Sequence, residues 1–74
     1  MSNPAGMRLE VGERPINLTQ VLKLAGCVES GGEAKALIGD GRVRVNGVVE
    51  TRKRRQMARG DIVEIEEAVR VELI

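Results

Sequence analysis

The dipeptide Asn46-Gly47 separates two valine-rich runs. It constrains the fold of this chain more than any other feature of the sequence. A two-residue type I′ hairpin turn needs positive φ at both central positions, and Asn and Gly both tolerate that conformation. We therefore expect an antiparallel hairpin whose strands cover about residues 42–45 and 48–51.

Pairing across this turn determines which side chains share a face of the hairpin. It sets Val45 opposite Val48 and Arg44 opposite Val49, and successive side chains point to opposite faces. One face should therefore pack against the core while the other presents guanidinium groups. The packing face would hold Val43, Val45 and Val48, and the other face would hold Arg42 and Arg44.

Four consecutive bases follow the second strand directly, and we call them the basic tetrad: Arg52, Lys53, Arg54 and Arg55. Such a run repels itself unless its side chains are spread over a solvated surface or face an anion. We expect all four side chains to be solvated. A bound polyanion would relieve their mutual repulsion.

Charge is distributed unevenly along the chain. The formal net charge is only +1, but residues 42–59 hold seven bases and a single acid, Glu50, so this segment alone carries +6. Salt screens charges that lie more than roughly 8 to 10 Å apart, so a concentrated patch can bind a polyanion although the net charge is near zero. The alternative is a cationic loop that is merely solvated. The adjoining hairpin, with its two arginines, favours a binding surface.

The chain is short and contains no Phe, Tyr or Trp. Its 74 residues allow a single domain, near the lower size limit for a core without disulfides or metal. The core must be built from aliphatic side chains and Met, so we expect it to be thin. Common single-strand-binding domains stack bases on aromatic rings, so the composition argues against that class. We expect a disordered start over residues 1–6 and one domain over residues 7–74.

Capping residues predict two short helices in the first half of the chain. Asn17 can cap the first helix, with Gln20 in the position that reaches back to the cap, and Ser30 and Glu33 form the same pattern at the second. A glycine follows or ends each helix. Apolar side chains at helical spacing would give each helix one buried face: Leu18, Val21, Leu22 and Ala25 in the first, and Ala34, Leu37 and Ile38 in the second.

Alternating apolar and polar residues predict three further strands, at residues 7–11, 62–66 and 69–73. The order along the chain is therefore one strand, two helices and then several antiparallel strands. This order predicts an α+β fold in which two short helices pack on a small antiparallel sheet of about four to five strands.

Two glycines, Gly31 and Gly32, lie between the Ser30 cap and Glu33. Glycine costs roughly 1 kcal/mol relative to alanine inside a helix, so two of them at a helix start need a reason. A bare first turn would let phosphate oxygens approach unsatisfied N–H groups at the positive end of the helix dipole, with Lys35 one turn further on. Alternatively, the glycines only shape a tight turn between the helices. The sequence leaves both explanations open.

Residues with catalytic or metal-binding chemistry are scarce. The chain has no His or Tyr, Cys27 is its only cysteine, and neither serine lies in a nucleophile elbow. One cysteine without histidine cannot make a zinc site, and Cys27 fits better as a small buried residue. We therefore expect no enzymatic activity, no cofactor and no metal. No apolar run approaches the length of a membrane span, so we expect a cytoplasmic protein.

Taken together, residues 18–65 resemble the αL-motif RNA-binding domain of the ribosomal-protein S-four type. The resemblance covers about two-thirds of the chain and rests on the combination of motifs rather than on any one of them. Besides the two short helices, it is carried by residues 33–38 (EAKALI), 41–47 (GRVRVNG) and 60–65 (GDIVEI).

Within this superfamily, the segments at residues 30–35 and 50–54 are most similar to small free-standing bacterial proteins of the YbcJ/YaaA type. The chain departs from the wider family at Gly31 and Gly32, because many members carry arginines at the start of the second helix. The contacts of those arginines cannot be transferred to this chain. The resemblance implies binding to structured RNA, often ribosomal, with no catalysis by this module.

The function that we expect is binding of structured RNA by a cytoplasmic monomer, with ribosomal RNA, a ribosomal subunit or its precursor as the partner. The alternative is a protein interaction module that uses the basic hairpin or the acidic C-terminal strands. Ribonuclease would abolish the first kind of association and spare the second. The residues expected to contact RNA are Lys23, Gly31, Gly32, Lys35, Arg42, Arg44, Asn46, Arg52, Lys53, Arg54, Arg55 and Arg59.

Overall fold

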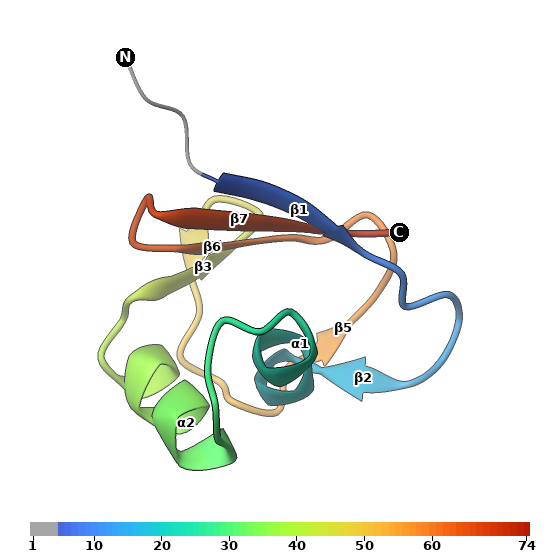
Figure 1. Ribbon diagram of the computed structural model, residues 1–74. Helices are drawn as coiled ribbons and strands as arrows, with labels where there is room; N and C mark the ends of the chain where they lie inside the picture. Colours follow the sequence, from blue (N-terminus) through green and yellow to red (C-terminus); the bar gives the residue numbers. More distant parts are fainter. Residues whose placement is uncertain (1–4) are drawn as a thin grey trace.

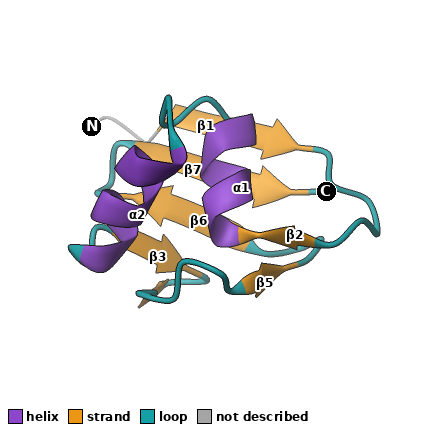
Figure 2. Ribbon diagram, turned by 90° about the horizontal axis from the view of Figure 1, so that it is seen from below, coloured by secondary structure: helices purple, strands orange, loops and turns teal. Residues whose placement is uncertain are grey.

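Seven strands and two helices make up residues 5–74, which are the residues that the computed structural model describes (Figure 1). Both helices lie against the same face of a five-stranded sheet, and a two-stranded sheet lies beside the first helix (Figure 2). In chain order the elements are β1 (Ala5–Leu9), β2 (Ile16–Asn17), α1 (Leu18–Leu24), α2 (Gly31–Gly39), β3 (Val43–Val45), β4 (Val48–Val49), β5 (Gln56–Met57), β6 (Ile62–Ile65) and β7 (Val69–Leu73).

The large sheet has the strand order β1-β7-β6-β3-β4, and its two helices and five strands confirm the predicted α+β class. The sheet is mixed rather than wholly antiparallel, because β1 pairs parallel with β7 and sets Met7 opposite Val71. The long crossover through both helices allows this parallel pairing. Pairing with β7 also extends β1 back to Ala5, so Ala5 and Gly6 of the predicted disordered start belong to a strand. Residues 1–4 lie outside the described residues.

Both helices begin at the predicted cap. The Asn17 side chain accepts a hydrogen bond from the Gln20 N–H, and the Gln20 side chain accepts one from the Asn17 N–H, each at 2.9 Å. Ser30 caps α2 by accepting a bond from the Glu33 N–H at 3.2 Å. The Glu33 carboxylate accepts from the N–H of Glu29 at 2.9 Å instead of from the cap. The predicted capping box of α2 is therefore only half formed.

A single core fills the space between the helices and the large sheet. Both helices contribute the faces that were predicted, and β3, β6 and β7 contribute alternate residues, as the pleat of a strand requires. The core is aliphatic apart from one methionine, as the composition predicts. Its buried residues are Val11, Ile16, Leu18, Val21, Leu22, Val28, Ala34, Ile38, Val43, Val45, Met57, Val63, Ile65, Val71 and Leu73.

The two-stranded sheet was not predicted from the sequence. In it β2 and β5 pair antiparallel, with Ile16 opposite Met57 and Asn17 opposite Gln56. Each strand has only two residues, which is too short for an alternating pattern to be recognised. This small sheet places the chain just after the basic tetrad against the start of α1.

The hairpin around Asn46-Gly47 forms as predicted, with φ of 53° and 85° at these two residues and Val45 opposite Val48. Its second strand is shorter than expected and ends at Val49. The prediction that Val48 packs in the core is wrong, because this residue is 69% exposed. β4 is the outermost strand of the sheet, so Val48 has a strand on one side only.

Candidate nucleic-acid interface

The connection between β4 and β5, residues 50–55, carries the basic tetrad, and we call it the basic loop. The first turn of α1 holds this loop by its backbone. The N–H of Leu18 donates to the Arg55 carbonyl at 3.0 Å. Thr19 donates to the Lys53 carbonyl from its N–H at 3.2 Å and from its hydroxyl at 2.8 Å. The first N–H groups of a helix have no partner within it, so the loop carbonyls satisfy donors that would otherwise be free.

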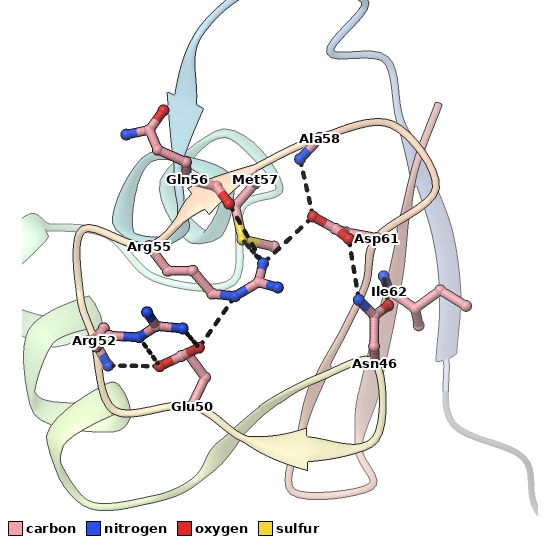
Figure 3. A network of polar contacts seen from close by, with 9 residues as sticks. All are labelled: Asn46, Glu50, Arg52, Arg55, Gln56, Met57, Ala58, Asp61 and Ile62. Carbon is pink, nitrogen blue, oxygen red and sulfur yellow. Dashed lines mark hydrogen bonds and ion pairs between the residues drawn. The ribbon is translucent and has the colours of Figure 1, made fainter.

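Glu50, the only acid in the basic loop, is bound by two of its arginines (Figure 3). Arg52 donates from Nε to Oε2 and from Nη2 to Oε1, each at 3.0 Å, and its backbone N–H donates to Oε2 at 3.0 Å. The Arg55 Nε lies 3.1 Å from Oε1. The hydrogen bonds from Arg52 and the charges of both arginines lower the pKa of Glu50 to about 2. At neutral pH this carboxylate is therefore ionised and paired.

Arg55 is not solvated, which corrects the expectation for this member of the tetrad. Its side chain is only 26% exposed, its Nη1 lies 3.4 Å from the Asp61 Oδ2, and the same atom donates to the Met57 Sδ at 3.2 Å. Figure 3 shows the guanidinium between Glu50 and Asp61. The expectation fails because carboxylates on two sides attract the group, and one of them comes from beyond the run of bases. The other members of the tetrad are exposed as predicted: Arg52, Lys53 and Arg54.

Asn46 uses its side-chain amide within the fold. Its Nδ2 donates to the Asp61 Oδ1 at 3.0 Å, and its Oδ1 accepts from the Ile62 N–H at 2.9 Å. Asp61 also accepts from the Ala58 N–H at 2.9 Å. Burial alone would raise the pKa of Asp61, but its hydrogen bonds and the neighbouring charge of Arg55 lower it. Asn46 therefore links the hairpin turn to β6 and to the network that braces the basic loop.

An open groove of about 490 Å³ lies between α2 and the basic loop. Lys35 and Gly39 line it from α2, and residues 51–54 line it from the loop. Lys35, Lys53 and Arg54 form no ion pair within the described part of the chain. The groove therefore brings together three positive charges from two segments that are distant in sequence.

α2 presents its basic side to this groove and its acidic side elsewhere. Lys35 and Gly39 are one turn apart and share a side of the helix. Glu33 and the C-cap residue Asp40 lie roughly 140° to 160° around the helix axis from Lys35. Because Gly39 has no side chain, the position one turn after Lys35 places no side chain beside it.

The two glycines at the start of α2 do not adopt a conformation that requires glycine. Neither Gly31 nor Gly32 has positive φ. Apart from the adjacent residues and the nearby backbone of α2, a Cβ at Gly31 would meet no heavy atom of the described residues within 4 Å, and one at Gly32 would meet only the Ser30 Oγ, at 3.9 Å. The turn between the helices therefore does not require glycine at either position. They leave the first turn of α2 bare, with Gly31 one turn before Lys35 on the same side of the helix.

The two hairpin arginines lie on the other face of the large sheet, away from the core. Arg44 pairs in register with Glu64 of β6, and the Arg42 Nε lies 2.9 Å from the Glu66 Oε1. Both arginines border a second cavity together with Glu64, Glu66 and Glu67. Acids therefore lie beside both arginines, and neither arginine lines the groove beside the basic loop.

Lys23 and Arg59 are exposed, but neither lines the groove. Lys23 lies on α1, one turn after Thr19, where it borders a largely apolar cavity with Leu24. Arg59 lies in the turn that precedes β6, beside Gly60, whose φ is 94°.

Three uncharged residues of the site were not predicted from the sequence. Thr51 and Gly39 line the groove, and Thr19 holds the basic loop. The bond between Thr19 and Lys53 joins residues that are 34 positions apart, so no local pattern could have revealed it.

The described residues contain no group of three or more His, Cys, Asp or Glu side chains that could hold a metal ion. Cys27 has a free, half-buried thiol, and burial raises its pKa. Within residues 5–74, neither helix has the length and apolar character needed to cross a membrane.

Comparison with known proteins matches most of the chain to one family. The family model of the S4 domain matches residues 9–72. The "Putative RNA-binding protein YbcJ" of Escherichia coli (strain K12) is 46% identical over 54 residues, which cover 72% of this chain and 77% of YbcJ. The "Probable ribosome maturation protein RlbA" of Bacillus subtilis (strain 168) is 41% identical over 66 residues, which cover 89% of this chain and 87% of RlbA.

The fold is also similar to that of a solved relative. The solution structure of E. coli YbcJ, described as revealing an αL motif involved in RNA-binding, superposes with a TM-score of 0.60 at 41% identity. The match covers 97% of this chain and 91% of the YbcJ chain. The resemblance carried by residues 18–65 is confirmed, and this chain belongs to the S4 domain family.

Proposed function

We propose that this protein binds structured RNA without catalysing a reaction, and that the groove between α2 and the basic loop is its principal contact. The observation that carries the proposal is the convergence of Lys35, Lys53 and Arg54 on one groove, with no ion pair to any of them within residues 5–74. Unpaired bases gathered beside an open groove attract a phosphate backbone.

The relatives support RNA as the partner. YbcJ is named a putative RNA-binding protein, and its structure is described as carrying a motif involved in RNA-binding. RlbA is named a probable ribosome maturation protein. We infer that the RNA is ribosomal, in a subunit or in its precursor.

Recognition by this groove would depend on phosphates and on RNA shape. The chain has no aromatic ring on which a base could stack, so the mode used by common single-strand-binding domains is unavailable to it. Lys35 and Lys53 would act as point charges, while the guanidinium of Arg54 can bind a phosphate with two parallel hydrogen bonds. The bare first turn at Gly31 and Gly32 would let the RNA backbone come close to α2.

The other candidate residues would have lesser or indirect roles. Asn46 and Arg55 would support the basic loop, because their polar groups already have partners within the fold. Lys23, Arg42, Arg44 and Arg59 lie outside the groove and would contribute only to an RNA large enough to reach beyond it.

Binding of the 74-residue chain to extracted bacterial ribosomal RNA and to purified ribosomal subunits tests this proposal. We expect saturable binding that ribonuclease abolishes. If three or four phosphates are contacted, log affinity should fall against log salt with a slope of about −2 to −4. Binding that survives ribonuclease, or that does not change with salt, would contradict the proposal and favour a protein partner.

A further inference from the structure

We propose that Asp61 is a positioning residue for RNA binding: its carboxylate holds Arg55 inside the basic loop and thereby fixes the loop shape from which Lys53 and Arg54 reach the groove. This inference rests on the proposed RNA binding. Asp61 itself does not line the groove, and it carries the charge that RNA repels, so its effect on binding must be indirect.

The Asp61 carboxylate joins three separate parts of the chain. Its Oδ2 accepts from the Ala58 N–H at 2.9 Å and lies 3.4 Å from the Arg55 Nη1. Its Oδ1 accepts from the Asn46 Nδ2 at 3.0 Å. The side chain is only 19% exposed, and the hairpin turn, the turn before β6 and the basic loop all contact it.

The contact with Arg55 continues toward the groove. The Arg55 Nε lies 3.1 Å from Glu50, and Glu50 accepts two side-chain hydrogen bonds from Arg52, which lines the groove. Figure 3 shows this continuous row of polar groups from Asp61 to Arg52. Through these polar contacts the inward-pointing guanidinium of Arg55 links the first half of the loop to Asp61.

The backbone of the second half of the loop is held separately by α1. The carbonyls of Lys53 and Arg55 accept bonds from Thr19 and Leu18. Loss of Asp61 should therefore loosen the loop without detaching it, because the helix contacts remain. The Arg55 guanidinium would then have one carboxylate in place of two, and the ion pairs at Glu50 would be less constrained.

The direction in which RNA affinity changes in Asp61→Asn distinguishes a positioning role from simple electrostatic attraction. Asp61→Asn removes one negative charge and raises the net charge from +1 to +2. Electrostatic attraction alone would make the variant bind RNA more tightly. Positioning predicts weaker binding, because an amide at this site retains little attraction for the Arg55 guanidinium and can place an NH₂ group against another donor.

The experiment compares wild type, Asp61→Asn and Glu13→Gln for binding to extracted bacterial ribosomal RNA. Glu13 is exposed, and its side chain forms no hydrogen bond or ion pair among the described residues, so Glu13→Gln is a control with the same change in charge. We expect Asp61→Asn to weaken binding by about threefold to tenfold and the control to bind as tightly as wild type or slightly more tightly. Circular dichroism checks that each variant is folded.

A double-mutant cycle shows whether Asp61 acts through the groove bases. In a Lys53→Gln/Arg54→Gln background, we expect Asp61→Asn to change affinity by less than about twofold, because the residues that it positions are already lost. An equal weakening in both backgrounds would overturn the inference, as would Asp61→Asn binding as tightly as wild type.

Arg55→Lys is the second test, since it keeps the charge but cannot reach both carboxylates as a guanidinium does. It should weaken binding to a similar extent, and wild-type affinity in this variant would also overturn the inference.

The two proposals fail in different ways. If wild type binds and Lys53→Gln/Arg54→Gln binds far more weakly, while Asp61→Asn binds like wild type, only the positioning role is rejected. If wild type does not bind RNA, or the groove double variant binds as wild type does, the proposed function is rejected and the positioning role with it.

Discussion

The carboxylate of Glu50 accepts two hydrogen bonds from the guanidinium of Arg52, from Nε and from Nη2, each at 3.0 Å. In this forked geometry two parallel charge-assisted hydrogen bonds join the arginine and the carboxylate, which makes the pair strong and geometrically specific. It places the only acid of the basic loop against the base two positions later, with the Glu50 side chain just 12% exposed. The loop therefore contains its own counter-charge and still presents Lys53 and Arg54 with no ion pair among residues 5–74.

The first prediction concerns the stability that Glu50 provides. Glu50→Gln should lower the free energy of unfolding by about 1 to 3 kcal/mol, because charge-assisted hydrogen bonds are lost and the half-buried Arg55 keeps fewer partners. Urea unfolding should show a lower midpoint with an unchanged slope. Glu67→Gln, an exposed acid in the turn before β7, should stay within about 0.5 kcal/mol of wild type. Equal stability of both variants would contradict a bracing role for Glu50.

A second prediction follows from the lowered pKa of Glu50, which falls from 4.5 to about 2. Because the pKa in the folded state lies below that of the unfolded chain, the ionised group stabilises the fold fully above about pH 4.5. That contribution is lost as the pH falls through about 2. The lowered pKa of Asp61 acts in the same direction. Urea midpoints measured from pH 7 to pH 2 should fall less steeply for Glu50→Gln than for wild type, and parallel curves would contradict the assignment.

Much of this fold could be predicted from the sequence because the relevant signals are local. The Asn46-Gly47 turn, the Asn17 and Ser30 caps and the alternation in β7 each depend on a few neighbouring residues. The local backbone preferences of these residues agree with the final structure, so the elements form where they were expected.

Most of the features that were missed depend on contacts between separate segments of the chain. The parallel pairing of β1 with β7 and the small sheet of β2 with β5 join strands that the sequence gives no reason to bring together. The inward orientation of Arg55 needs Asp61, six residues beyond it and just before β6. The sequence alone predicts that all four bases of the tetrad are solvated. The fold shows that two carboxylates hold Arg55, whereas the other three bases are exposed.

A third prediction tests the contact between the basic loop and α1. Thr19→Val keeps the shape of the side chain but removes the hydroxyl that donates to the Lys53 carbonyl at 2.8 Å. It should lower the free energy of unfolding by about 0.5 to 1.5 kcal/mol, the usual net contribution of one hydrogen bond. Thr19→Ser keeps the hydroxyl and should retain most of the stability. If the two variants are equally stable in thermal or urea unfolding, the hydroxyl bond does not hold the loop.

A fourth prediction concerns the bare first turn of α2. Alanine at Gly31 and Gly32 meets no crowded atom and should stabilise the helix by a few tenths to about 1 kcal/mol per site. If the RNA backbone approaches this turn, the same double variant should bind ribosomal RNA more weakly despite its greater stability. Opposite changes in stability and affinity would support the phosphate-approach explanation. Unchanged affinity would show that RNA does not come close to this part of α2.

The measurement that tests the central claim most directly is the salt dependence of RNA binding by Lys53→Gln/Arg54→Gln. Its matched control is Arg14→Gln/Arg70→Gln, which removes the same charge at two exposed sites outside the groove that form no ion pair among the described residues. We predict that the groove variant stays folded, binds ribosomal RNA far more weakly and has a slope of log affinity against log salt that is shallower by roughly 1.5 to 2, while the control keeps the wild-type slope. Equal affinities and slopes for the two double variants would contradict the groove as the RNA site.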